Sequence, residues 1–556
     1  MTEDRDDTTR YLCAAAHLDA GFADNAIREY LLEPTRPGAP SPGVDAAPVL
    51  GEAIAARRRR KLVDWSVLVL AVIALFTLPG TLLLVWLLLA LLVTGAITAW
   101  QRRKGPVRPS TPPSGAVLGA VVGTLAAVVV GLALFTYLDS DPFASAYSRR
   151  RSRSEIYTLA EDDDGSIAVV FAVVVPLLAV LLLNRLAVWR LLTVQFHRGN
   201  RAGAALRAGL SNRPILESAP SRFTERLHAE YLSGTANEDP AAVPVVVHRG
   251  YHPFVGAGST FEPWSIATAL VRDEQREQTA LLSTSALYEA ITTEVAKLHT
   301  ATALAPGARL RALSTTEHVI VSARELVDHV GTAEGAEFLA APGQRPTRWV
   351  GRTRAEVLRD LPVEWARYYR CFQVETWDRD LVLSVYLHVA MDGSTLYVEW
   401  TPCVLRPIDQ RFQQIDKARH SPLRPYLAGL GDLIRLPATL PARAASALTF
   451  LRRSHDDLDP DRYGSRDSLR ELAQDPGLHN YFQLADTERY LKLLESRLVV
   501  AVTTLLREAG YSPASFEAQA STVVNNNIRI GGSVQGAVVA GSGNKVSSPL
   551  EPKPKE

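Results

Sequence analysis

Long uncharged apolar runs divide this chain into a part suited to lipid and a part suited to water. The first run extends from Trp65 to Trp100 without a charged residue. A helix needs about 20 apolar residues to cross a bilayer core of ~30 Å, so this run is long enough for two spans. Leu78-Pro79-Gly80-Thr81 lies near its centre, and Pro followed by Gly favours a turn. We therefore predict a transmembrane hairpin over residues 62–104, with one long kinked helix as the alternative.

Two further apolar runs predict a third span at residues 115–138 and a fourth at residues 167–190, which contains Pro176. The third run has a small residue at every fourth position, which is typical of a helix-packing face in membranes. These residues are Gly115, Gly119, Gly123, Ala127 and Gly131. The uncharged blocks themselves, Trp65–Trp100, Gly115–Leu138 and Ile167–Leu183, contain no ionisable residue that could serve as a relay, which disfavours an ion-coupled transporter but leaves a passive pore open.

Basic residues beside the spans predict their orientation. Arginine and lysine cluster at residues 57–61, at 102–108 and again from Arg185 to Arg207. Short basic flanks stay in the cytoplasm, so we expect four spans in the cell membrane, with both termini cytoplasmic. The loop at residues 139–166 would then be external, although its four arginines at 149–153 oppose that assignment.

Outside the spans, the N-terminal part reads as a small helical module over residues 1–34. Apolar positions predict one helix from about Thr9 to Leu32. Four prolines between residues 34 and 42 then indicate a linker, which with its basic flank covers residues 35–61.

The largest predicted soluble unit is a cytoplasmic α+β domain over residues 200–416. Its clearest signal is an antiparallel meander between Tyr369 and Leu405, with strict alternation from Leu381 to Val389 and an Asp392-Gly393 turn. Val243 to Val247 predicts a further buried strand. Helical patterns at Ala280–Thr300 and Arg354–Leu358 complete the α+β character.

Candidate chemistry in this domain is sparse. Gly256-Ala257-Gly258 follows a strand but lacks the rest of a phosphate loop, and the prolines and glycines around His248 and His252 oppose a helical metal site. We expect His388 at the surface, and we expect Cys371 and Cys403 as reduced, inert neighbours in outer strands of the meander. No catalytic, cofactor-binding or metal-binding residue is assigned, so an enzyme is the least favoured class. Lys plus Arg is 60 and Asp plus Glu is 59, so no nucleic-acid partner is expected.

Residues 417–515 are predicted to be mainly helical. The apolar, basic stretch from Leu423 to Arg453 either lies on the anionic inner leaflet or packs as a helix on its own domain. His455 to Gly477 reads as an exposed connection. Asp486 to Ala509 predicts an amphipathic helix, capped by Asp486 or Thr487 at its start and by Gly510 at its end.

The tail at residues 516–556 is rich in glycine and β-branched residues, including Val523. Its strands would be too short to fold alone, but identical tails could stack with paired backbones and Asn ladders. The residues expected to self-associate are Ile528, Ile530, Val534, Gln535, Val538, Val539 and Asn544. The alternative is a flexible tail without its own function.

Several strings resemble a known group of proteins. Arg10 to Tyr30, the PSPGVD of Pro40 to Asp45 and the PFVGAG of Pro253 to Gly258 resemble large, uncharacterised, multi-pass membrane proteins of actinobacteria. The tail also resembles bacterial amyloid signalling motifs related to necroptosis-adaptor motifs, although Arg529 stands where Gln is usual. The resemblance implies topology and lineage and carries over no catalytic residue.

Two classes of function follow from these expectations. The first is a membrane-anchored interaction or signalling scaffold that recruits partners with similar tails. The second is an oligomeric, pore-forming membrane effector whose copies associate through the small-residue stripe. A membrane-bound enzyme of unknown reaction is the third alternative.

Overall fold

The chain forms two compact units, each built from separate stretches of sequence. This computed structural model describes residues 7–103, 161–196, 222–232, 242–274, 280–299, 312–416, 422–451, 453 and 455–525. The first unit, here called the sheet unit, comprises Met1–Ala53, Arg201–Gln413 and Arg452–Glu556. The second, the helical unit, comprises Ile54–Asn200 and Gln414–Leu451. Residues 414–451 therefore leave the sheet unit, join the helical unit and return.

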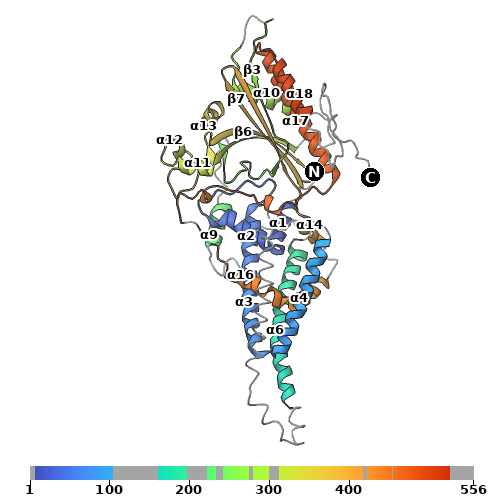
Figure 1. Cartoon of the computed structure of the whole chain (residues 1–556). Coiled ribbons are helices and arrows are strands. Elements are labelled where there is room, and N and C mark those ends of the chain that lie inside the picture. Colours follow the sequence, from blue (N-terminus) through green and yellow to red (C-terminus); the bar gives the residue numbers. More distant parts are fainter. Residues whose placement is uncertain are drawn as a thin grey trace, which may run out of the picture. The chain divides into compact units, whose positions relative to one another are not determined.

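The described strands of the sheet unit form one mixed sheet of eight strands (Figure 1). Its order is β2-β8-β7-β6-β4-β1-β5, and β3 pairs with β8. Among these described strands, β1 and β4 are the pair that runs parallel. The strands are β1 (Val243–His248), β2 (Ser259–Thr260), β3 (Trp264–Ala269), β4 (Leu313–Ser322), β5 (Trp349–Val350), β6 (Ala366–Thr376), β7 (Leu381–Asp392) and β8 (Thr395–Leu405). The predicted α+β character and the strand at Val243–Val247 are thus confirmed.

The predicted meander is confirmed as β6, β7 and β8. Val385 pairs with Phe372 on one side and with Pro402 on the other. Gly393 takes a φ of 47° in the β7–β8 turn, as the Asp-Gly signal indicates. The β6–β7 turn is less expected, because Trp377, Asp378 and Arg379 all have positive φ values of 53–65° without being glycine.

Helices cover one face of the sheet and form its main core. α10 (Thr284–Ala296) and α13 (Arg352–Asp360) contact β7, and α17 (Tyr481–Glu508) packs on α10 (Figure 1). Leu494, Leu498 and Val502 of α17 are fully buried at helical spacing. They join Phe372 and Trp400 in one apolar cluster.

Two helix boundaries differ from the sequence prediction. α17 begins at Tyr481, where the Asn480 side chain accepts a hydrogen bond from the Phe482 N–H, and Asp486 instead lies inside the helix. The N-terminal module is broken at Asp19 into α1 (Asp7–Leu18) and α2 (Ala20–Ile27). Asp19 caps α2 through the Gly21 N–H at 2.7 Å, a local hydrogen bond that competes with helix continuation.

Shorter elements complete the sheet unit. They are the π-helical turns η1 (Arg28–Leu32) and η4 (His228–Leu232), the helices α9 (Arg222–Leu227), α11 (Ala323–Asp328), α12 (Ala333–Ala336), α14 (Gln410–Gln413) and α18 (Ala514–Asn525), and the 3₁₀ turns η5 (Lys297–His299), η8 (Pro460–Arg462) and η9 (Glu471–Ala473). α18 contacts β3 and holds Val523 against the core, so Val523 is helical and not part of a strand. The tail residues from 526, including every predicted self-association residue, lie outside the described residues.

Among its described residues, the helical unit contains two helices that are long and apolar enough to cross a membrane, at Gly80–Ala99 and Val170–Gln195. They belong to α4 (Gly80–Arg103) and to α6 (Glu161–Arg190), which continues into the π-helical turn η3 (Leu191–Gln195). α3 (Ala46–Thr77) starts in the sheet unit and ends in the helical unit. α15 (Arg424–Ile434) and α16 (Leu436–Leu448) complete the helical unit.

The predicted spans correspond to the helices only in part. The turn of the hairpin is present, since α3 ends at Thr77 and α4 begins at Gly80. α6 runs through Pro176 and starts earlier than predicted, within the expected external loop. The third span, with its small-residue stripe from Gly115 to Gly131, lies outside the described residues. Four spans and their orientation therefore stay a prediction.

Candidate functional site

The face of the sheet opposite α10 and α17 carries an aromatic and polar surface. On this face Cys371, Tyr386 and Cys403 are buried together with Phe254 and Tyr369. The Phe254 ring stacks on Tyr386 with 4.3 Å between ring centroids and meets Tyr369 edge-on at 5.3 Å. Tyr386 thus lies at the centre of the site, with Phe254 covering it from the loop after β1.

A roof formed by residues 35–45 and 249–258 closes this face. These segments contain the PSPGVD and PFVGAG strings, and they meet where Gly256 approaches Pro40. A Cβ atom on Gly256 would lie 2.1 Å from the Pro40 carbonyl oxygen, and the φ of Gly256 is 94°. Glycine is required here for both reasons. Tyr30 holds the first segment, because its hydroxyl donates to the Ala39 carbonyl at 2.9 Å.

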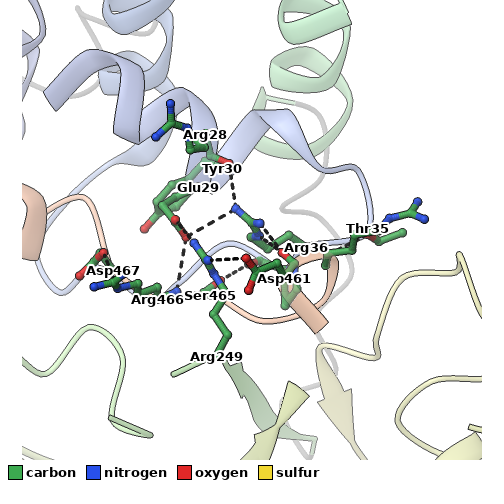
Figure 2. Close-up of polar contacts among 12 residues, drawn as sticks. Arg28, Glu29, Tyr30, Thr35, Arg36, Arg249, Asp461, Ser465, Arg466 and Asp467 are labelled. Atoms are coloured by element: carbon green, nitrogen blue, oxygen red, sulfur yellow. Dashed lines mark hydrogen bonds and ion pairs between the residues drawn. The ribbon is translucent and has the colours of Figure 1, made fainter. Parts of the chain in front are cut away.

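A buried ion network holds the start of this roof in place (Figure 2). Glu29 of η1 accepts a hydrogen bond from Arg249 and lies 3.6 Å from Arg36. Arg36 also donates to the Asp461 carbonyl at 3.0 Å, and Arg249 lies 3.3 Å from the Asp461 carboxylate. Ser465 donates to the Pro37 carbonyl at 2.5 Å. The network therefore ties the N-terminal module to the end of β1 and to residues 461–465.

The glycine loop that the sequence suggested as a weak phosphate site binds a carboxylate of the chain itself. The N–H groups of Gly256 and Gly258 donate to Glu471 at 3.0 and 2.9 Å. Ser468 adds a third N–H at 2.7 Å and receives one in return from Glu471 at 3.2 Å. The pKa of Glu471 is raised, because burial outweighs the lowering effect of these hydrogen bonds. The anion-binding geometry of the loop is thus already used by an internal acid.

Between roof and sheet lies a cavity of about 50 Å³. Its lining includes Pro40, Pro42, His318, Cys371, Gln373 and Tyr386. This volume holds a few water molecules and no organic substrate, so a larger ligand requires the roof to move.

The ionisable groups that line the cavity are held in their neutral forms by burial. Burial lowers the pKa of His318 to about 4 and raises the pKa of Cys371 to about 12. The pKa of Tyr386 lies well above its ordinary value for the same reason. A thiol with a raised pKa is a poor nucleophile, and a neutral imidazole of such low basicity is a poor general base. The three groups are therefore uncharged near neutral pH.

The histidines that the sequence singled out have different positions. His388, expected at the surface, is 5% exposed, and its Nδ1 lies 3.0 Å from the Tyr368 carbonyl. Its strand runs through the centre of the sheet, and its ring lies 5.5 Å from that of Tyr369. His248 is partly buried while His252 is exposed, and no cluster of potential metal ligands occurs in the described part of the chain.

Residues 455–477, expected to be an exposed connection, instead hold several buried groups. Tyr463 and Ser468 are fully buried, and so is Arg470, whose nitrogens have no hydrogen-bond partner within the described ranges. Burial lowers the pKa of Arg470 to about 10, and the nearby charge of Asp380 opposes that shift. Polar composition suggested exposure, but Tyr463 and Ser468 form hydrogen bonds inside the fold, and Arg470 is buried near the opposite charge of Asp380. The Ser468–Glu471 spacing of a capping box was the available signal.

The fold and site define an α+β unit with a mixed sheet, in a chain that also contains long apolar helices. Residues 263–538 match the AbeC-like domain, slightly less than half of the 556-residue chain. The match begins just before β3 and includes the meander, α15, α16 and α17, but it excludes β1 and both roof segments. The domain is uncharacterised, and the match gives no activity. No curated protein matches the chain. No solved structure matches it either.

Proposed function

We propose that this protein is a membrane-anchored interaction or signalling scaffold. The observation that carries the proposal is the exposure of the apolar helices α4 and α6. Only 6% of the most apolar stretch of α4 and 17% of that of α6 are buried. A core helix of a water-soluble protein would be mostly buried, so these side chains favour contact with lipid. The neutral, poorly reactive groups around the cavity support binding over catalysis.

The anchoring is tested by fractionating cells that express the full chain. Washing the membrane fraction with alkaline carbonate should leave the protein in the pellet, and reporter fusions at residue 50 and at the C-terminus should both report cytoplasm. Release by carbonate would overturn the anchoring. An external signal from either fusion would overturn the orientation.

The scaffold role is tested by capturing the detergent-solubilised protein with and without residues 526–556. A scaffold that recruits through its tail should lose defined partners when the tail is removed. Equal capture by both forms would contradict recruitment through the tail. Leakage of dye from vesicles that contain the full chain would favour the pore-forming alternative instead.

A further inference from the structure

The polarity of α15 is reversed relative to a helix of a water-soluble protein. Its buried side carries Pro425, Gly429 and the carboxylate of Asp432. Its exposed side carries the large apolar residues Tyr426, Leu427 and Leu430, and Leu423 is exposed just before the helix. Leu427 is 68% exposed, whereas Asp432 is 9% exposed. Water-soluble helices bury the apolar side and expose the charged side, so this arrangement indicates that the outer surroundings of α15 are apolar.

The inner side of α15 is fitted to the two apolar helices of the helical unit. Arg185 of α6 donates two hydrogen bonds to Asp432, at 2.6 and 2.9 Å. Gly429 lets the helices approach closely, because a Cβ atom there would lie 2.5 Å from the side chain of Leu182. Trp86 of α4 donates from Nε1 to the Leu433 carbonyl at 3.0 Å. Small residues and paired polar groups at helix contacts are typical of membrane helices.

α16 and the residues after it continue this pattern beside α3. Arg443 donates to Asp64 of α3 at 2.9 Å, so the acid inside this contact is paired. Beyond the helix, Lys61 donates to the Thr449 carbonyl at 3.0 Å, and its ammonium lies 4.5 Å from the centre of the Phe450 ring. Phe450 is 70% exposed. An exposed aromatic ring beside a lysine is the side-chain pair expected where a protein meets the headgroup level of a bilayer.

We propose that residues 422–451 are embedded in the same bilayer as α4 and α6, with the outer side of α15 in contact with lipid. The proposal rests on the membrane anchoring proposed above and adds a segment that is too short and too interrupted to span a membrane by itself. The basic residues at 57–61 and Arg443 would face anionic headgroups beside it. The chain thus returns to the membrane after the meander, between two stretches of the sheet unit.

Lipid explains the observations better than a second copy of the chain. The exposed apolar residues are found on α15 and also on α4 and α6, where Leu92, Phe171 and Leu183 are all more than 60% exposed. A bilayer covers all these helices together, whereas one protein partner would need to cover each of them.

The test places a spin label at residue 427 of the full chain in phosphatidylcholine–phosphatidylglycerol vesicles. The native cysteines Cys13, Cys371 and Cys403 are buried, and unsubstituted protein gives the background labelling. In Leu427→Cys, collisions with oxygen should exceed collisions with a water-soluble nickel complex. Leu281→Cys is the matched control, because Leu281 is fully exposed in the sheet unit. Its label should favour the nickel complex.

A third position separates failure of this proposal from failure of membrane anchoring. Leu92→Cys reports on α4, and Leu92 is 72% exposed. Nickel access at residue 427 together with oxygen access at residue 92 would overturn the lipid contact of α15 alone. Nickel access at both would overturn the anchoring as well. A label at residue 427 that neither reagent reaches would indicate a protein partner and would also overturn the proposal.

Discussion

At the scale of single residues, burial decides the chemistry of this protein more than residue type does. His318 and Cys371 could suggest a reactive pair from their identities alone. The structure places them in the lining of one small cavity, where burial lowers the pKa of His318, raises that of Cys371 and keeps both groups uncharged. The Glu471 carboxylate similarly fills a glycine loop that an external anion would otherwise contact.

The pH dependence of stability should show the effect at His318. Its pKa is lowered to about 4 in the folded protein, so the unfolded chain binds the proton first as the pH falls below about 6.5. His318 therefore favours the folded state above pH 6.5, and this advantage is lost as the pH falls to about 4. The wild type loses free energy of unfolding as the pH falls from about 6.5 to about 4, and His318→Gln should reduce this loss by roughly 1–3 kcal/mol.

Thermal unfolding of the detergent-solubilised protein between pH 7 and pH 4 measures this effect. His248 and His388 also have pKa values lowered by burial, but they are present in both proteins and cancel in the comparison. His252→Gln, at an exposed position, is the control. Parallel stability profiles for wild type and His318→Gln would contradict the prediction.

The β6–β7 turn provides a second residue-scale prediction. Asp378 is exposed and has a φ of 53°, a conformation that costs a non-glycine residue about 1 kcal/mol. Asp378→Gly should therefore raise the free energy of unfolding by about 0.5–1 kcal/mol. Asp392→Gly, at the last residue of β7 where Asp392 pairs with Thr395, should lower it, because glycine weakens the end of the strand. Calorimetry on both variants checks the opposite signs.

At the scale of elements, the roof depends on the contact between Gly256 and Pro40. Gly256→Ala adds strain at a φ of 94° and a clash with the Pro40 carbonyl. Gly250→Ala is a matched control, because Gly250 has a φ of 88° with nothing within 4 Å of its Cβ position. Both changes should lower the free energy of unfolding by about 1 kcal/mol, because alanine is strained at a positive φ. The clash with Pro40 should lower it by roughly 1–3 kcal/mol more in Gly256→Ala.

Limited proteolysis shows whether the extra cost acts on the roof. Cleavage within residues 35–45 should become faster in Gly256→Ala than in Gly250→Ala, because only the first change displaces the Pro40 segment. Equal cleavage of both variants would mean that the close approach does not hold the roof closed.

At the scale of the whole molecule, the sheet unit is assembled from three distant stretches of sequence. The ion network around Glu29 joins all three, since its partners Arg249 and Asp461 lie more than 200 residues from it along the chain. Breaking such a buried pair from one side leaves a charge without compensation. We therefore expect the network to help keep the N-terminal module docked on the sheet unit.

Arg249→Ala should destabilise the sheet unit by about 2 kcal/mol, because the buried Glu29 keeps Arg36 at 3.6 Å but loses the hydrogen bond from Arg249. Arg466→Ala is the control, since the Arg466 side chain is 70% exposed and its partner lies at 3.8 Å. It should change stability by less than about 1 kcal/mol. Thermal unfolding measures both, and similar losses in the two variants would contradict the proposed role of the network.

Local patterns were enough to predict several elements. Alternation from Leu381 to Val389 with the Asp392-Gly393 turn gave the meander, because a period of two and a tight turn act over a few residues. Apolar length and Pro79-Gly80 gave the break between α3 and α4. Boundaries were less certain, since the caps at Asp19 and Asn480 depend on single side-chain hydrogen bonds.

The sequence by itself therefore determined the apolar helices and the antiparallel core of the sheet, since each is a property of adjacent residues. Only the tertiary structure decided that residues 35–45 and 249–258 roof a neutral cavity, and that α15 lies against α4 and α6 with its apolar side exposed. These features bring together residues hundreds of positions apart. The free energy that selects them comes from burial and pairing across the folded chain, which no local pattern records.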